Sequence, residues 1–314
     1  MICQNPFSVS YRISKYMKNF ITAFVFLSAA VAASAQDALT SEYNYSPFRR
    51  IVVNDGFDFS IVNSEDYSVR LSADADIFTY AHAFVKDSTL FLELDSEAFP
   101  SDVKKRLSGK DSPVLFLRAE IGVPDIDVVE IHDNAVMDSK EPFTCGNVSL
   151  VVDGSAMIAG LEISADCVSL DLTRNSSASV SVKADSLKVV SSALASVTVA
   201  GSTVYSAFKA LGNSSLTVNC VSDECRIASE SAAEVSVSGK ADVFSVTGRA
   251  GSIVNAEDML SDKADVSLSM ASHCTLGKTD SLSVDLIGGS HLIVDGNPPI
   301  QISRILSSSV THPE

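Results

Sequence analysis

Residues 149–160 of the sequence read SLVVDGSAMIAG, and this stretch decides the fold. A run of alternating apolar residues typical of a β-strand comes first, a group of very small residues follows, and a second apolar stretch closes the unit. Similar units recur along the C-terminal half of the chain. A segment that returns at a fixed spacing indicates a repeat architecture, so the small residues must have a role that each repeat needs.

The repeats align on a small residue near the centre of each unit. Successive aligned residues are 17 to 22 positions apart, about 19 on average. Two positions after each of them lies an apolar residue, or in one unit the thiol Cys274. The aligned small residues are Asn134, Ala156, Ala178, Ala195, Ser214, Ala233, Gly251, Ser272, Ser290 and Ser308.

This period, with its alternation of apolar and polar residues, predicts an all-β fold, a parallel β-helix with coils of about 19 residues. A leucine-rich repeat has a similar period but requires a Leu and Asn pattern that the sequence lacks. In a β-helix, equivalent side chains of successive coils stack about 4.8 Å apart. Bulky side chains would collide at a corner, whereas Ser, Ala, Gly and Asn fit, and Gly and Asn also adopt the left-handed backbone conformation.

The region at 47–126 differs from the repeats, which we expect to occupy residues 127–314. Its alternating runs predict antiparallel strands joined by hairpin turns such as Asn54-Asp55-Gly56. We expect this antiparallel β region to cap the N-terminal end of the β-helix, because an open end leaves strand edges unpaired. The runs lie at 49–62, 67–73, 89–95 and 113–124.

Composition and charge exclude several classes of partner. The chain has 314 residues, is 46% hydrophobic and carries a formal net charge of −16 at pH 7. It can therefore bury a large core. It lacks the basic face that binding to nucleic acids or to anionic lipid surfaces requires, so we expect no nucleic-acid partner.

The first residues predict export. Met17 and Lys18 precede the apolar stretch 20–27, and Ala33-Ser34-Ala35 matches the small-x-small pattern of a signal-peptidase site. Residues 1–35 are thus interpreted as an upstream extension and a signal peptide, the mature chain begins at Gln36, and 36–46 form a linker. We expect no transmembrane span after cleavage and a periplasmic, outer-membrane-associated or extracellular location.

Two groups of residues are candidates for metal binding. His273 and His291 each follow the corner residue of adjacent coils, so their imidazoles are expected to lie about one strand spacing apart. No third ligand is evident in that column, and an exposed pair is favoured over a metal site. The acidic segment 125–133 contains Asp125 and Asp127, but its acids alternate along a strand, so solvated carboxylates are favoured over a calcium site. We predict no cofactor.

The mature chain contains five cysteines, in a compartment where disulfides persist. Cys145 and Cys167 each lie eleven positions before their aligned small residues, Ala156 and Ala178. This spacing makes them candidates for a disulfide between neighbouring coils. The alternative is that they are buried free thiols, as we expect for Cys274 in the apolar column.

The sequence resembles a known bacterial family. The segments FRRIVVNDGFDFSIVNSEDYSVRLSADADI at 48–77, TLFLELD at 89–95 and VPDIDVVEIHDNAVM at 123–137 precede the serial small-residue units. In this order they are similar to the GIN-domain family of auto-transporter adhesin head domains, found in exported β-helix proteins of the Bacteroidetes type. The resemblance covers roughly residues 47–312. It implies an exported β-helical domain with a role in adhesion, and it supplies no catalytic residues.

The uniform coils leave little chain for the walls of a catalytic groove, and no Ser-His-Asp arrangement or paired carboxylate column stands out. We therefore expect a non-catalytic, exported surface-recognition protein, an adhesin or envelope binding module. Its partner would be a macromolecular surface: a glycan, a matrix protein or an envelope protein. A periplasmic scaffold or sensor partner is the first alternative, and a polysaccharide lyase or hydrolase of the pectate-lyase-like type is the second.

Overall fold

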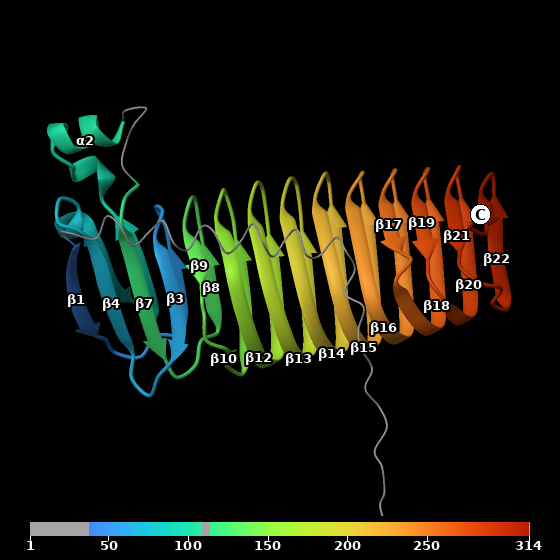
Figure 1. Ribbon diagram of the computed structural model, residues 1–314, viewed down its shortest axis with the longest axis horizontal. Coiled ribbons are helices and arrows are strands. Elements are labelled where there is room, and N and C mark those ends of the chain that lie inside the picture. The colour runs from blue at the N-terminus through green and yellow to red at the C-terminus, as the bar shows by residue number, and fades with distance from the viewer. Residues whose placement is uncertain (1–37, 109–113, 314) are drawn as a thin grey trace, which may run out of the picture. The chain divides into compact units, whose positions relative to one another are not determined.

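The computed structural model describes residues 38–108 and 114–313 (Figure 1). Contacts group Leu39–Glu314 in one compact unit. The predicted signal peptide and the predicted mature N-terminus at Gln36 lie outside the described residues.

Strands make up most of the described chain. The N-terminal strands are β1 (Ala38–Asn44), β2 (Arg50–Val53), β3 (Asp58–Asn63), β4 (Ser68–Asp74), β5 (Ala81–Lys86), β6 (Thr89–Leu94) and β7 (Leu117–Val123). Among them lie the short 3₁₀ helices η2 (Phe78–Tyr80) and η3 (Ser96–Ala98) and the helix α2 (Ser101–Leu107).

The remaining strands build the repeats. They are β8 (Val128–Ile131), β9 (Val136–Asp138), β10 (Phe143–Thr144), β11 (Asn147–Val152), β12 (Met157–Leu172), β13 (Ser177–Ser191), β14 (Ser196–Leu211), β15 (Ser215–Glu230), β16 (Glu234–Arg249), β17 (Ile253–Ala256), β18 (Met259–Ser269), β19 (His273–Leu276), β20 (Thr279–Ile287), β21 (His291–Val294), β22 (Ile300–Leu306) and β23 (Ser309–Thr311).

These repeats form a parallel β-helix, and the predicted fold class is confirmed. β13 and β14 pair in parallel from Ser177↔Ser196 to Ser191↔Ala210, a constant offset of 19 residues. The same offset joins β14 to β15 and β15 to β16. Figure 1 shows the successive coils side by side. Each long strand bends through a corner, so one coil contributes to two faces of the β-helix.

Alternation along each strand separates the core from the surface. On β14, Val197 and Val199 are each 1% exposed, whereas their neighbours Ser196 and Thr198 are exposed. Successive side chains of a strand point to opposite faces, so the valines line the interior and the hydroxyl residues face outward. Stacking of the coils joins these apolar side chains into one continuous core.

Small residues form a buried column at one corner of the coils, as the steric argument predicts. The pairs Met157↔Ser177 and Ser177↔Ser196 place the preceding residues, Ala156, Ser176 and Ala195, directly above one another. Every member from Ala135 to Ser290 is at most 1% exposed. This corner column comprises Ala135, Ala156, Ser176, Ala195, Ser214, Ala233, Ser252, Ser272 and Ser290.

Three of the aligned residues chosen from the sequence lie outside the corner column. Asn134 and Gly251 are one position too early, and Ala178 is two positions too late. Ala178 instead faces the interior between Ile158 and Val197. The cause is that several small residues adjoin each corner, and size alone does not distinguish which of them is buried.

A second column, two positions before the corner column, has left-handed backbone. Its first five members are Asp133, Gly154, Arg174, Ala193 and Gly212, with φ between +57° and +78°. We expected Gly and Asn in this conformation, yet Asp133, Arg174 and Ala193 adopt it as well. Left-handed backbone costs an L-residue about 1–2 kcal/mol, and the stacked coils on both sides hold these residues in place despite that cost.

The N-terminal part of the fold departs from a simple succession of hairpins. β2 pairs in parallel with β6 on one side and with β8 on the other, and β3 likewise pairs with β7 and β9. The β2–β3 coil therefore lies inside the stack, between the β6–β7 coil and the β8–β9 coil. The turn at Asn54-Asp55-Gly56 is a coil corner and not the predicted hairpin turn, because β2 and β3 pair with other strands.

Antiparallel strands are present at this end, in agreement with the predicted fold class. β4 pairs antiparallel with β7, and β5 pairs antiparallel with β6. β1, which lies within the predicted linker, pairs with β4. β4 and β5 thus occupy the outer edges of the β6–β7 coil, and we call β1, β4 and β5 the cap strands.

Candidate functional site

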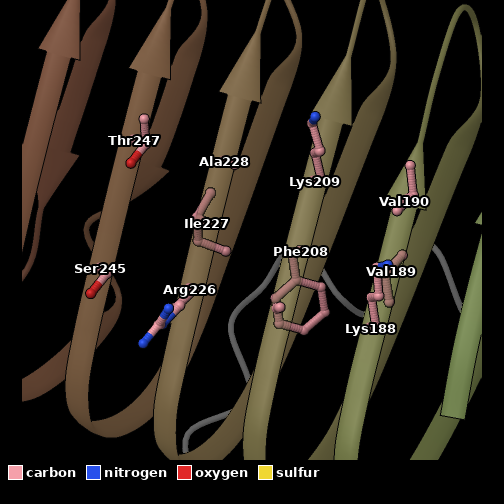
Figure 2. Close-up of a pocket in the computed structure, with 11 residues that line it drawn as sticks. Lys188, Val189, Val190, Phe208, Lys209, Arg226, Ile227, Ala228, Ser245 and Thr247 are labelled. Atoms are coloured by element: carbon pink, nitrogen blue, oxygen red, sulfur yellow. The ribbon is translucent and has the colours of Figure 1, made fainter.

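A depression of about 420 Å³ lies on the outward face formed by the second halves of β13 to β16 (Figure 2). Strand register sets its lining in two rows. One row is Lys188, Ala207, Arg226 and Ser245, and the next is Val190, Lys209, Ala228 and Thr247.

The depression exists because long and short side chains alternate along these rows. In the first row Ala207 lies between Lys188 and Arg226 on the neighbouring coils. In the second row Ala228 follows Lys209. Adjacent coils are about 4.8 Å apart, so the two alanines leave a low floor between longer side chains. All three cations are exposed.

Arg226 is held in position by two neighbours. Its Nε donates a hydrogen bond to Oε1 of Glu224, at 2.6 Å, and its guanidinium carbon lies 5.6 Å from the centre of the Tyr205 ring. The bond to Glu224 raises the pKa of Arg226. A guanidinium ordered in this way keeps other donors free for a carboxylate or a hydroxyl.

The two lysines differ from Arg226. Among the residues that the structure describes, neither Lys188 nor Lys209 has a carboxylate within ion-pair distance. The acid next to them in the register is Asp171, which lies opposite Val190. Three exposed cations thus surround an apolar floor on a chain of net charge −16. The arrangement suits an anionic group that also presents an apolar surface.

Sequence reasoning missed these three cations. Lys188, Lys209 and Arg226 are 21 and 17 residues apart, and none belongs to a recognisable motif. A usable signal was nevertheless present, since Lys188 and Arg226 differ by 38 positions, which is two coils of the 19-residue register.

His273 and His291 are brought together as predicted. They pair across β19 and β21, and their ring centres are 5.8 Å apart. Both ring nitrogens of His291 already have hydroxyl neighbours, Ser309 Oγ at 2.7 Å from Nδ1 and Thr311 Oγ1 at 3.1 Å from Nε2. Within 38–108 and 114–313, no group of three or more metal-binding side chains gathers around them.

Asp125 and Asp127 both bind Arg49. The Arg49 Nε donates to Asp127 Oδ2 at 2.8 Å, and Arg49 Nη1 lies 3.2 Å from Asp125 Oδ2. The bond from Arg49 lowers the pKa of Asp127. Asp125 also accepts a hydrogen bond from the backbone N–H of Gly146, at 3.2 Å. These carboxylates fasten neighbouring coils to each other and are not simply solvated.

The predicted Cys145–Cys167 pair is not formed, and both cysteines are free. Cys167 lies opposite Asn147, and the backbone N–H of Cys145 bonds to the carbonyl of Ser164. The local offset is 20 residues, whereas the two cysteines are 22 residues apart. The error follows from the two-residue misplacement of Ala178. Burial raises the pKa of Cys145 to about 11.

These observations define the chain as a capped parallel β-helix with an open, cationic depression on one face. Residues 47–207 and 198–298 match the family described as "Putative auto-transporter adhesin, head GIN domain". The two segments span more than half of the chain, and the chain belongs to this family. The resemblance found in the sequence is confirmed.

Three of the solved structures to which this chain is similar come from Parabacteroides. A "putative adhesin" from Parabacteroides merdae is 13% identical, with a TM-score of 0.47, and the alignment covers 89% of this chain and 98% of that one. A "putative adhesin" from Parabacteroides distasonis is 14% identical, with a TM-score of 0.45 and coverages of 88% and 97%. A "putative lipid binding protein" from the same species is 14% identical, with a TM-score of 0.44 and coverages of 89% and 98%.

A comparison with curated proteins gives no match. Over the described part of the chain, no helix has the length and apolar character needed to cross a membrane.

Proposed function

We propose that this protein is a non-catalytic, exported recognition protein that binds an acidic polysaccharide at the depression around Lys188, Lys209 and Arg226. The proposal rests on the presence of three exposed cations around one depression, whose floor includes Ala207 and Ala228. Membership of a family described as adhesin heads supports a role in surface recognition.

Carboxylated sugars fit the chemistry of this surface. Their carboxylates accept hydrogen bonds from the two lysines and from Arg226, while the apolar faces of sugar rings pack on the alanines. Ser245 and Thr247, at the edge of the depression, offer hydroxyls to neutral sugar oxygens.

Titration of polygalacturonate into the purified chain, with neutral dextran as the comparison ligand, tests the proposal. The variant Lys188→Ala/Lys209→Ala should bind polygalacturonate at least about tenfold more weakly. A tenfold change in Kd corresponds to about 1.4 kcal/mol of binding free energy. Binding should also weaken as salt is added, because exposed charges are screened.

The matched control is Lys183→Ala/Lys240→Ala, which removes the same charge from a different row, away from the depression. It should bind like the unmodified chain. Equal loss in both double variants would mean that net charge alone attracts the polymer, and the proposed site would be abandoned. Absence of binding to any acidic polysaccharide would have the same consequence.

Polysaccharide cleavage is the second candidate, because Lys188, Lys209 and Arg226 lie on three successive coils. A lyase acting on uronates needs a base and a cation that stabilises the charge on the substrate carboxylate. Release of unsaturated sugar products from polygalacturonate, abolished by Lys209→Ala alone, would replace the recognition proposal with this one.

A further inference from the structure

Two cysteines of one coil face each other in the core. Cys220 and Cys225 both belong to β15, and their Sγ atoms are 3.7 Å apart. Their exposed fractions are 1% and 0%. The four residues between them, 221–224, form a corner that folds the strand back, so the two thiols meet inside the β-helix.

The neighbouring coils approach this pair closely at two glycines. Cys220 lies between Gly201 and Gly239 in the register, and Cys225 lies between Ser206 and Phe244. A Cβ added to Gly239 would lie 2.0 Å from the carbonyl oxygen of Cys220, so nothing larger than glycine fits there without a shift of the backbone. Because neither glycine presents a side chain to Cys220, its sulfur can move the further distance, roughly 1.7 Å, that an S–S bond of about 2.05 Å needs.

We propose that Cys220 and Cys225 form a disulfide within their coil when the protein is exported. The inference does not depend on the ligand proposed above, but it does require the oxidising compartment that the signal peptide predicts.

The reaction is thiol–disulfide exchange with a disulfide-bearing oxidant, either a thiol oxidoreductase or a small disulfide such as oxidised glutathione. The thiolate of one cysteine attacks the oxidant, forms a mixed disulfide and releases one oxidant sulfur as a thiol. The second cysteine then attacks the mixed disulfide, forms the Cys220–Cys225 bond and releases the other oxidant sulfur. Two electrons and two protons pass from the protein to the oxidant.

Burial fixes when this exchange takes place. Neither sulfur is accessible in the folded coil, so the oxidant reacts before the coil is closed by its neighbours. Once the coil has closed, the bond is equally inaccessible to reductants. Among the described cysteines, Cys145 and Cys167 are out of register with each other, and Cys274 is buried at a separate place in the core.

Peptide mapping of the chain from Gln36 onward tests the proposal. The chain is refolded with oxidised glutathione, its free thiols are alkylated in denaturant, and it is cut by trypsin together with a protease specific for Glu, so that Cys167 and Cys220 fall on different peptides. Cleavage after Glu224 separates the two cysteines, so their peptides should stay joined until a reductant is added. Cys145, Cys167 and Cys274 should be alkylated.

Two variants serve as controls. Cys274→Ser should leave the joined peptides unchanged, whereas Cys220→Ser should leave Cys225 alkylated and create no other linkage. Alkylation of all five thiols in the unmodified chain, or a linkage of Cys220 or Cys225 to a different cysteine, would overturn the proposal. Mapping of the unmodified chain gives this answer even if Cys220→Ser fails to fold.

Discussion

At the corner column, one side chain in each coil determines how closely the coils stack. Ser and Ala both serve there, because each serine hydroxyl finds a hydrogen-bond partner in its own corner or on a neighbouring coil. Ser176 donates to the carbonyl of Thr173 at 2.7 Å, Ser272 to that of Ser269 at 2.8 Å and Ser290 to that of Ile287 at 2.9 Å. A buried serine in this column therefore has no unpaired hydroxyl, and its size is what matters.

Substitutions in the corner column and in the interior column two positions after it should differ in their effect on stability. Ala195→Leu should lower the free energy of unfolding by about 2–3 kcal/mol, because the corner column has no room for three more carbons. Ala178→Val should change it by less than about 1 kcal/mol, because its column already holds Ile158 and Val197. Urea unfolding of both variants measures this, and a neutral Ala195→Leu would contradict the steric account.

Ala178 shows what the sequence alone could not predict about single residues. The pattern predicted that a small residue fills each corner, and the structure confirms that role. It did not reveal which of several consecutive small residues is the buried one, since Ser176 and Ala178 differ little in size. The two-residue error then carried over into the Cys145–Cys167 prediction.

Among the elements, ion pairs between neighbouring coils support the corners. Asp153 follows β11, and its carboxylate binds Arg174 and the hydroxyl of Thr173, both on the next coil. These contacts, the bond from Arg174 foremost, hold the pKa of Asp153 well below its ordinary value. The pair spans two coils at the point where Arg174 has left-handed backbone.

This pair should make stability depend on pH. Because the folded-state pKa of Asp153 is lowered, its stabilising effect is complete above the unfolded value of about 4 and is lost as pH falls toward the folded value. The difference in unfolding free energy between the unmodified chain and Asp153→Asn should therefore be smaller at pH 2 than at pH 7. Urea titrations at both pH values measure it.

Arg174→Ala is the matched variant, since it removes the other half of the pair. It should reduce the pH dependence by a similar amount, and adding Asp153→Asn to it should have little further effect. If Asp153→Asn were equally harmful at both pH values, the ion pair would not be the cause.

Strand pairing in the N-terminal part shows what an alternating pattern does and does not predict. The pattern located most of β2 to β7, because each strand buries one face. It did not identify partners, and the turn at Asn54-Asp55-Gly56 reads equally well as a hairpin or as a coil corner. Parallel pairing of β2 with both β6 and β8 depends on contacts between segments far apart in sequence.

Across the whole described unit, the two ends of the stack differ. The cap strands cover the N-terminal end. At the other end, β22 pairs with β20 and leaves Ile302 and Leu306 60% and 57% exposed. A deletion that removes the covering strands would therefore expose new strand edges at the N-terminal end.

Removal of residues 38–126, which contain the cap strands and the β2–β3 and β6–β7 coils, should make the β-helix self-associate. A fragment of residues 127–314 loses β2 and β3, so β8 and β9 keep one free edge each and present it to other copies. Light scattering during refolding should show aggregates for this fragment and none for residues 38–314 at the same concentration. A monomeric fragment that melts cooperatively would show that the β-helix does not need residues 38–126 to avoid self-association.

The candidate site depends on the stacking of several coils. Composition correctly indicated an acidic chain, but the depression depends on three cations that no local pattern connects. Only the 19-residue register places Lys188, Lys209 and Arg226 beside the two alanines. Motifs alone therefore brought forward only the histidines and the acidic segment as candidates, and neither was favoured as a metal site.

The position of the β2–β3 coil inside the stack has a consequence for the order of folding. A chain that emerges N-terminus first delivers β2 and β3 long before β6 and β7, and β8 and β9 later still. This first coil must wait for partners on both sides, and closing such long loops is slow. From β11 onward each coil meets a neighbour that is already in place. Folding thus has one slow start near residue 138, after which it proceeds coil by coil toward the C-terminus as fast as chain arrives.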